Sequence, residues 1–212
     1  MSRAWISLLL ALFFAAGVWW AERGCDRANA GISERRPFAS IAPDRVARIE
    51  IEHLLDGVRL TRENGAWRVG EFDTAMRQEA RAQTEAKPSG EAAPIAAADT
   101  ATHPADAARV DEALVTLRAL STTSLASINP AQHGTYQVDR LGVRVRCLNE
   151  QGDPLASFVI GKQAADFFST YLRIGEEDRV YVTREALQAH FPIRIEHWRR
   201  REIPMPPWLR SS

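Results

Sequence analysis

The N-terminal segment constrains this chain most, because residues 4–21 include no charged side chain. As a helix, such a run spans roughly 27 Å at about 1.5 Å per residue, close to the ~30 Å hydrocarbon core of a bilayer. Trp5 lies near one end of the run, and Trp19 and Trp20 lie at the other, where indole rings favour the membrane interface. The sequence therefore predicts a transmembrane helix that anchors the protein through residues 1–23.

A cleaved secretory signal is the alternative to an anchor. Such a signal has an apolar region of about 7–15 residues followed by a cleavage site of small residues. The run Ala15-Ala16-Gly17 offers such a site, but cleavage there would leave Trp19 and Trp20 next to the mature terminus. The length of the apolar run and the position of these indoles favour the anchor.

The distribution of arginine bears on the orientation of the anchor. Arg3 precedes the apolar run, whereas Arg23, Arg27, Arg35 and Arg36 follow it, so a count of positive charge favours a cytoplasmic domain. That rule loses force when a long domain follows the helix, as here. We therefore expect a single-pass protein of the cell inner membrane whose bulk lies in the periplasm, with the charge count as the opposing argument.

The composition and motifs exclude several classes of protein. The chain carries 27 basic and 27 acidic side chains, and a balanced charge argues against binding to nucleic acid. With only Cys25 and Cys147, it is neither a disulfide-dense scaffold nor a Cys-based zinc protein. It also lacks a phosphate-binding loop, a Gly-x-Ser-x-Gly elbow and a His-x-x-x-His pair. We therefore expect no catalytic residue, no cofactor and no metal site; an enzyme acting on envelope polymers is the weakest alternative.

The first part of the soluble region predicts an antiparallel meander. Apolar and polar residues alternate over 45–52, over 57–62 and again over 66–69. Asn64-Gly65 lies between the last two runs and is a strong signal for a tight hairpin turn. The preceding residues, 24–43, are polar with scattered Gly and Pro and are expected to form a stalk.

An alanine-rich stretch then interrupts the pattern. Residues 74–102 hold no large aromatic side chain and are expected to form a mobile insertion. Ala, Glu, Gln and Arg over 74–86 favour a helix as the alternative for the first part. Order resumes over 105–120, where Val110 and Leu114 begin an apolar stripe of helical spacing.

The second half is rich in predicted strands. Runs over 142–148 and 155–161 are followed by a hairpin that pairs 169–174 with 179–182. A loop is expected over residues 121–133, a short helix over residues 184–190 and a Pro-rich tail over residues 204–212. The predicted fold over residues 44–203 is therefore an α+β domain of antiparallel β meanders with one main amphipathic helix packed on the sheet, in addition to the N-terminal transmembrane helix.

The ordered series of these short motifs resembles a bacterial family called domain of unknown function 4340. The resemblance runs from Arg45 to Ile203, apart from the alanine-rich insertion. Members look like N-terminally anchored envelope proteins, and some are similar to auxiliary components encoded with ABC-2 or gliding-motility-type transporters. The resemblance implies an accessory or assembly protein that binds an integral membrane protein of an ABC-type transport system, and it implies no catalytic residue. The residues that carry it are Val46, Ile49, Ile51, Leu60, Gly65-Ala66-Trp67-Arg68-Val69, Val110, Leu114, Leu117, Ile160-Gly161-Lys162, Ser169-Thr170-Tyr171-Leu172-Arg173, Val180-Tyr181-Val182 and Trp198-Arg199.

Four residues form the candidate binding face. Tyr171 and Arg173 share one face of a predicted strand and could grip an anionic or aromatic ligand, unless they form a packing pair with Arg173 bonded to a local carboxylate. Trp198 and Arg199 could touch anionic lipid or a partner, unless Trp198 closes the core. The alternative function is therefore a periplasmic ligand-binding or sensory module for an anionic or carbohydrate ligand.

Overall fold

The computed structural model describes residues 34–86 and 95–201. The predicted anchor over residues 1–23, the first part of the predicted stalk and the predicted tail over residues 204–212 lie outside these residues. Within the described ranges, every helix falls short of the length and apolarity that a membrane crossing requires.

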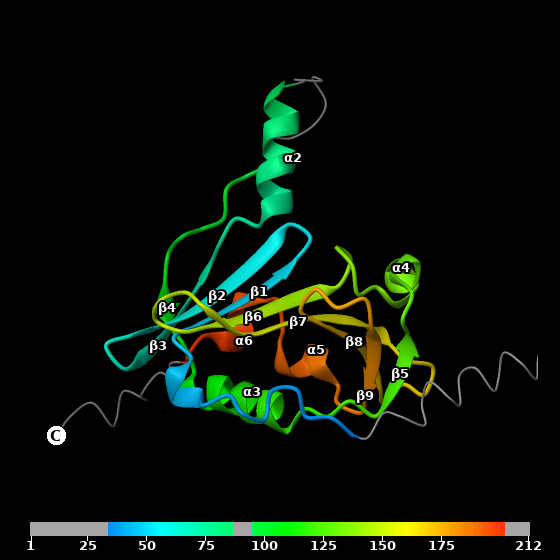
Figure 1. The fold of residues 1–212 in the computed structure, drawn as a ribbon. Helices are drawn as coiled ribbons and strands as arrows, with labels where there is room; N and C mark the ends of the chain where they lie inside the picture. Colours follow the sequence, from blue (N-terminus) through cyan, green and yellow to red (C-terminus); the bar gives the residue numbers. More distant parts are fainter. Residues whose placement is uncertain (1–33, 87–94, 202–212) are drawn as a thin grey trace, which may run out of the picture.

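The described residues form one antiparallel sheet of nine strands with several helices, so the α+β prediction is confirmed. The strand order is β4-β3-β2-β1-β6-β7-β8-β9-β5 (Figure 1). Two meanders therefore lie side by side, and the pairing of β1 with β6 joins them into a continuous sheet. The strands are β1 (Arg48–His53), β2 (Asp56–Glu63), β3 (Ala66–Glu71), β4 (His103–Pro104), β5 (Ser124–Ser127), β6 (Val143–Leu148), β7 (Pro154–Gln163), β8 (Thr170–Ile174) and β9 (Val180–Thr183).

The predicted hairpins are present. Asn64 and Gly65 connect β2 to β3 with φ values of 51° and 80°, which suit the right-handed twist of the flanking strands. The predicted pairing in the second half is also present as β8 with β9, and Gly175 in their turn has a φ of 54°. Positive φ at these positions explains why Asn and Gly occupy them.

The helices divide between the two sides of the sheet. In Figure 1, α3, α5 and α6 lie on one side, whereas α2 rises from the other. We call the side covered by α3 the inner face and the opposite side the outer face. The helices are η1 (Pro43–Arg45), α2 (Ala75–Ala86), α3 (Ala107–Ala119), η2 (Pro130–Gln132), α4 (His133–Tyr136), α5 (Leu187–His190) and α6 (Ile195–Trp198).

The core lies between the inner face and α3. The predicted amphipathic helix is confirmed as α3, whose N-cap Asp106 accepts a hydrogen bond from the Ala108 amide at 3.2 Å. Its apolar stripe is buried against strand residues of the inner face. Burial of this kind is the main stabilising term of a small domain. The buried residues include Val110, Leu114 and Leu117 of α3 and Ile49, Ile51, Leu60, Val145, Phe158 and Leu172 of the sheet.

The segment before η1 packs against this core. Phe38 is 5 % exposed and its ring centroid lies 5.3 Å from that of Phe158 in β7, and Ile41 is also buried. The packed body thus includes residues that the sequence assigned to a stalk over 24–43. The sequence did not predict the burial of these two side chains, because two isolated apolar residues among scattered Pro and Gly show no helical or strand periodicity.

Two other segments differ from the simplest expectation. The predicted loop over 121–133 contains the edge strand β5, which was missed because Ser-Leu-Ala-Ser lacks clear alternation and is held by backbone bonds to β9. The first part of the alanine-rich insertion, 74–102, is the helix α2, which corresponds to the helical alternative for that stretch.

Candidate functional site

The four residues of the candidate binding face lie on both sides of the sheet. Leu172, between the two β8 candidates, is fully buried on the inner face, so Tyr171 and Arg173 point to the outer face because side chains alternate along a strand. Trp198 belongs to the inner-face core, and Arg199 follows it at the end of α6. The structure therefore brings Tyr171 together with Arg173 but does not join this pair to Trp198 and Arg199.

Arg173 is held by local partners. Its Nε donates to the Val138 carbonyl at 2.8 Å, and one terminal nitrogen lies 3.5 Å from a Glu176 carboxylate oxygen. Only 7 % of Arg173 is exposed, and its cross-strand neighbours are Val159 and Val180. This is the arrangement of the packing alternative, with the guanidinium bonded to a nearby carboxylate.

Tyr171 packs beside the short helix α4. The ring centroids of Tyr171 and Tyr136 are 4.6 Å apart with the rings tilted. Burial raises the pKa of Tyr171, with further contributions from Tyr136 and Asp166. The close approach depends on Gly161, where any Cβ would overlap the Tyr136 carbonyl oxygen and the Val138 side chain.

Trp198 and Arg199 tie the end of the described chain to the core. Trp198 is 2 % exposed, and its indole Nε1 donates to the Pro192 carbonyl at 2.8 Å. Its own carbonyl accepts from the amide of Asp106, the N-cap of α3. A terminal nitrogen of Arg199 lies 3.1 Å from Nδ1 of His103. The indole thus closes the core, and Arg199 remains on the surface.

The outer face carries a ladder of charged side chains where the two meanders join, over β2, β1 and β6. The carboxylate of Glu50 in β1 lies 3.0 Å from Nε of Arg59 in β2 and 3.0 Å from a terminal nitrogen of Arg146 in β6. Glu52, two residues further along β1, lies 3.7 Å from both Arg144 and Arg146. We call these five residues the charged face.

The charged face combines a buried carboxylate with guanidinium groups that are accessible to solvent. The side chain of Glu50 is only 7 % exposed, whereas those of Arg59 and Arg146 are 41 % and 40 % exposed. Arg59 also stacks over the Phe72 ring at 4.7 Å from its centroid. The acid therefore positions guanidinium groups that still reach solvent, where they can bind carboxylates or polar backbone groups of another molecule.

The sequence contained a partial signal of the charged face. Charged residues occupy alternate positions of β1 and of β6, which indicates one polar face for each strand. The pairing of β1 with β6 joins strands about 95 residues apart, and no local pattern gives that register. The ladder was missed for this reason.

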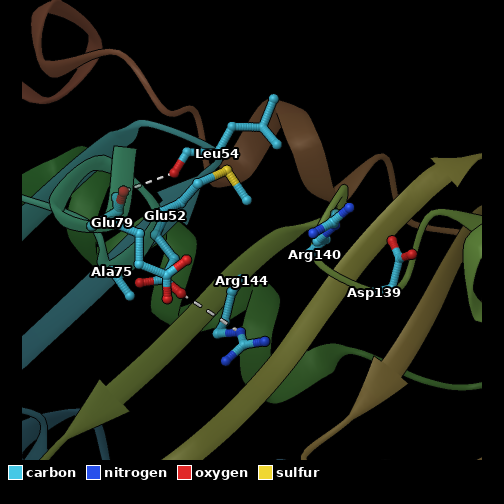
Figure 2. A pocket seen from close by; sticks show the side chains of 10 residues that line it. Glu52, Leu54, Ala75, Glu79, Asp139, Arg140 and Arg144 are labelled. Carbon is cyan, nitrogen blue, oxygen red and sulfur yellow. Dashed lines mark hydrogen bonds and ion pairs between the residues drawn. The ribbon is translucent and has the colours of Figure 1, made fainter. Parts of the chain in front are cut away.

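An open cleft continues from the charged face toward α2. It encloses about 250 Å³ and is bordered by the β1–β2 turn, the first turns of α2 and the loop before β6. Figure 2 shows the ion pair of Glu52 with Arg144, with Glu79 nearby on α2 and with Arg140 and Asp139 on the far side. We call this space the α2 cleft. It presents both signs of charge beside Leu54, so it suits a polar peptide surface better than an apolar small molecule.

Polar contacts at its base orient α2. The Thr74 hydroxyl donates to the Leu54 carbonyl at 2.7 Å and accepts from the Arg77 amide at 3.1 Å. The Asp73 carboxylate lies 3.0 Å from Arg81 and accepts from the Ala98 amide at 2.7 Å. These bonds fix the first turns, and no side chain between 75 and 85 is buried. The helix therefore stands away from the sheet with its surface available for contact.

A second cavity of about 370 Å³ lies where β6 and β7 meet the segment that contains α5 and α6. Its walls combine apolar side chains such as Phe191 and Val143 with His53, Gln188 and Arg194. The Gln188 side-chain amide donates to the Gly161 carbonyl at 3.1 Å. We call this space the end cavity; its volume falls in the range that small ligands use.

Cys147 is a buried free cysteine. Burial raises the pKa of Cys147 from its ordinary value to about 12, so its thiol stays protonated and unreactive. Within 34–86 and 95–201, no group of three or more His, Cys, Asp or Glu side chains is arranged to hold a metal ion.

Comparison with known proteins identifies one family. The model of the family described as Domain of unknown function (DUF4340) matches residues 96–204, just over half of the chain. The matched span contains α3 and the second meander, whereas β1–β3 and α2 precede it. No curated protein and no solved structure matches the chain.

Proposed function

This chain belongs to the DUF4340 family, and from that premise we propose that it is a membrane-anchored extracytoplasmic accessory or assembly protein. Its domain binds an integral membrane partner, such as a subunit of an ABC-type transport system, and catalyses no reaction. The observation that carries the proposal is the uncharged run over 4–21, which precedes by fewer than twenty residues a packed body that begins near Phe38.

Tethering supports a binding role by raising local concentration. A domain confined to the membrane surface meets an integral partner at an effective concentration set by the linker, so a modest surface suffices for stable association. The charged face and the α2 cleft provide such a surface. Their guanidinium groups and carboxylates give register and specificity to a polar contact.

Membrane attachment and partner binding are tested on the full-length protein. Membranes are washed with alkaline carbonate, the protein is extracted with mild detergent, and the chains that copurify are identified by mass spectrometry. The proposal expects retention in the washed membranes and recovery of an integral membrane protein. Release into the wash, or recovery of the protein alone, would contradict it.

Charge reversal tests the surface itself. Glu79→Arg and Arg140→Glu change two exposed side chains on opposite sides of the α2 cleft, and each is expected to lower partner recovery by about tenfold, the equivalent of ~1.4 kcal/mol. Arg118→Glu is the matched control, because Arg118 is exposed on α3, on the other side of the sheet. Equal recovery for all three variants would show that the partner binds elsewhere.

The orientation has its own test. Protease added to spheroplasts is expected to digest the domain, because a periplasmic domain is accessible once the outer membrane is opened. Protection of the domain until the inner membrane is lysed would place it in the cytoplasm, as the count of arginines suggests.

The end cavity favours ligand binding as the second candidate function. Arg194 and Gln188 are convergent polar groups beside an apolar wall, which is the composition of many small-ligand sites. A carbohydrate or an anion bound there should shift the unfolding temperature of the wild type but not of an Arg194→Ala variant. The absence of any ligand in the purified protein, together with no shift across a panel of sugars and anions, would rule this candidate out.

A further inference from the structure

Two adjacent phenylalanines project from the turn between β7 and β8. Phe167 is 74 % exposed and Phe168 is 78 % exposed. Isolated exposed apolar side chains are ordinary, but two neighbouring aromatic rings at one turn form a patch that water solvates poorly. We call residues 164–169 the β7–β8 tip.

The β7–β8 tip is built to hold these rings outward. The Asp166 carboxylate accepts from the amides of Phe168 and Ser169 at 3.1 and 2.8 Å and from the Ser169 hydroxyl. Phe167 has a φ of 62°, a conformation that costs a non-glycine residue free energy. Its carbonyl accepts a hydrogen bond from the Gln163 side-chain amide. The turn therefore keeps a strained backbone while both rings stay in solvent.

The β7–β8 tip lies at the end of the sheet where the described chain begins. Thr170, directly after the tip, pairs with Thr183 at the end of β9. The next neighbour on that side is Thr123, whose amide bonds to β9, and Thr122 forms a bridge with Arg35. Strands are about 4.8 Å apart, so Arg35 lies within roughly 20 Å of the tip. In Figure 1 the blue segment that starts the described chain likewise begins beside β9.

The number of residues between the uncharged run and the described chain limits how far this end of the domain can lie from the bilayer. Thirteen peptide units separate Ala21, the last residue of the uncharged run, from Glu34, and they reach at most about 45 Å when fully extended. A tether that enters the described chain at Arg35 therefore keeps the end of the sheet that carries the β7–β8 tip within reach of the membrane. We propose that Phe167 and Phe168 insert into the interface of the bilayer that holds the anchor, an inference that rests on the proposed membrane anchor.

The charges around the β7–β8 tip are close to balanced. Lys162 and Arg184 are exposed beside it, as is Asp166, and Glu185 is half-buried. These four side chains therefore add little net attraction to anionic lipid. The rings carry the contact through burial of their apolar surface at the level of the headgroups, and the contact fixes the orientation of a domain that the anchor alone leaves free to rotate.

Photo-crosslinking in full-length protein tests this contact. Benzoylphenylalanine replaces Phe168 in one preparation and Gln151 in another, each reconstituted in vesicles of phosphatidylethanolamine and phosphatidylglycerol. Gln151 is the control because it is exposed in the turn between β6 and β7, at the opposite end of the sheet. The probe at 168 is expected to form lipid adducts at least five times as often as the probe at 151, in vesicles with and without the anionic lipid.

Three results would overturn the inference: equal lipid adducts at both positions, no lipid adduct at 168, or adducts at 168 to a second protein chain. Flotation of the vesicles separates this test from that of the anchor. If the protein does not float with the vesicles, the proposed membrane attachment fails. If it floats but the probe at 168 meets no lipid, the attachment stands and only the contact of the β7–β8 tip is refuted.

Discussion

Side chains alternate along the strands in both halves of the outer face, but the outward side chains of one half reach solvent and those of the other half are covered. Over β1, β2 and β6 the outward side chains form the charged face, which reaches solvent. Over β7, β8 and β9 the outward side chains Val159 and Val180 are buried with Val138 under the segment that contains α4. Alternation along a strand decides which residues point outward, but the connections between strands decide which of them remain available.

The placement of Arg173 shows the consequence. It alternates outward like Arg146, yet Arg173 is covered and bonded to the Val138 carbonyl, whereas the side chain of Arg146 is 40 % exposed. Arg173 therefore stabilises the fold, whereas Arg146 is available to bind another molecule.

The largest effect is expected at the centre of the inner face. Phe158 is fully buried, and its ring contacts those of Phe38 and Phe191 at centroid distances of 5.3 and 5.5 Å. Phe158→Ala should lower the free energy of unfolding by about 3–5 kcal/mol, because it removes apolar contacts and leaves a cavity.

The control for this change lies in the same hairpin. Phe168→Ala removes the same atoms from an exposed site and should alter stability by no more than about 0.5 kcal/mol in detergent solution. Chemical denaturation monitored by circular dichroism measures both values. A similar loss for the two variants would mean that the β7–β8 tip is packed in solution.

The next effect concerns the covered half of the outer face. Arg173→Ala leaves the buried Val138 carbonyl without its donor, which should cost about 1–3 kcal/mol. Recovery of the proposed membrane partner, measured on the folded variant, should be unchanged. The bond from Arg173 to the exposed Glu176 contributes little, so Glu176→Gln should be close to neutral. Loss of partner recovery without loss of stability would assign Arg173 to the binding surface.

Local patterns predicted the parts of this fold that local physics fixes. The turn at Asn64-Gly65 and the apolar stripe of α3 are set by residues close in sequence, and both were predicted. The junction of β1 with β6 was not, because hydrogen bonds between strands far apart in the chain leave no local signal. The edge strand β5 was missed because an edge held by β9 does not need apolar alternation.

The candidate site was harder to predict for a related reason. The sequence placed Tyr171 and Arg173 correctly on one face of a strand, but it gave no sign that the segment around α4 covers them. Predicting the charged face requires the registers of two strand pairs, because Glu50 lies opposite Arg59 in the pairing of β1 with β2 and opposite Arg146 in the pairing of β1 with β6. Exposure and long-range register are properties of the assembled sheet, and a single strand carries neither.

A pH titration sharpens the difference between buried and exposed groups. Cys147 faces the core, and its pKa is raised from 9.0 to about 12 by burial. The unfolded thiol ionises first, so the stability that the neutral buried thiol contributes is intact below pH 9 and is lost as pH rises from 9 to 12. The slope approaches about 1.4 kcal/mol per pH unit.

Comparison with Cys147→Ala isolates this contribution, because the other titrating groups are shared. The difference in unfolding free energy between the two proteins should shrink by about 1.3 kcal/mol from pH 8 to pH 10. A constant difference would show that the thiol meets water in the folded state.

The smallest effect is expected at the charged face. Glu50→Gln removes the charge that Arg59 and Arg146 share, and because both guanidinium groups are partly exposed the loss of stability should be about 1 kcal/mol or less and smaller in 1 M salt. Glu52→Gln, whose ion pairs are longer, is the matched control and should cost less. For Glu50→Gln, partner recovery should fall although the free energy of unfolding changes little. The freed guanidinium groups lose their fixed positions, whereas the sheet keeps its core. If stability falls by several kcal/mol while partner recovery per folded molecule is unchanged, the charged face is part of the scaffold, like Arg173, and the contrast between the two halves of the outer face disappears.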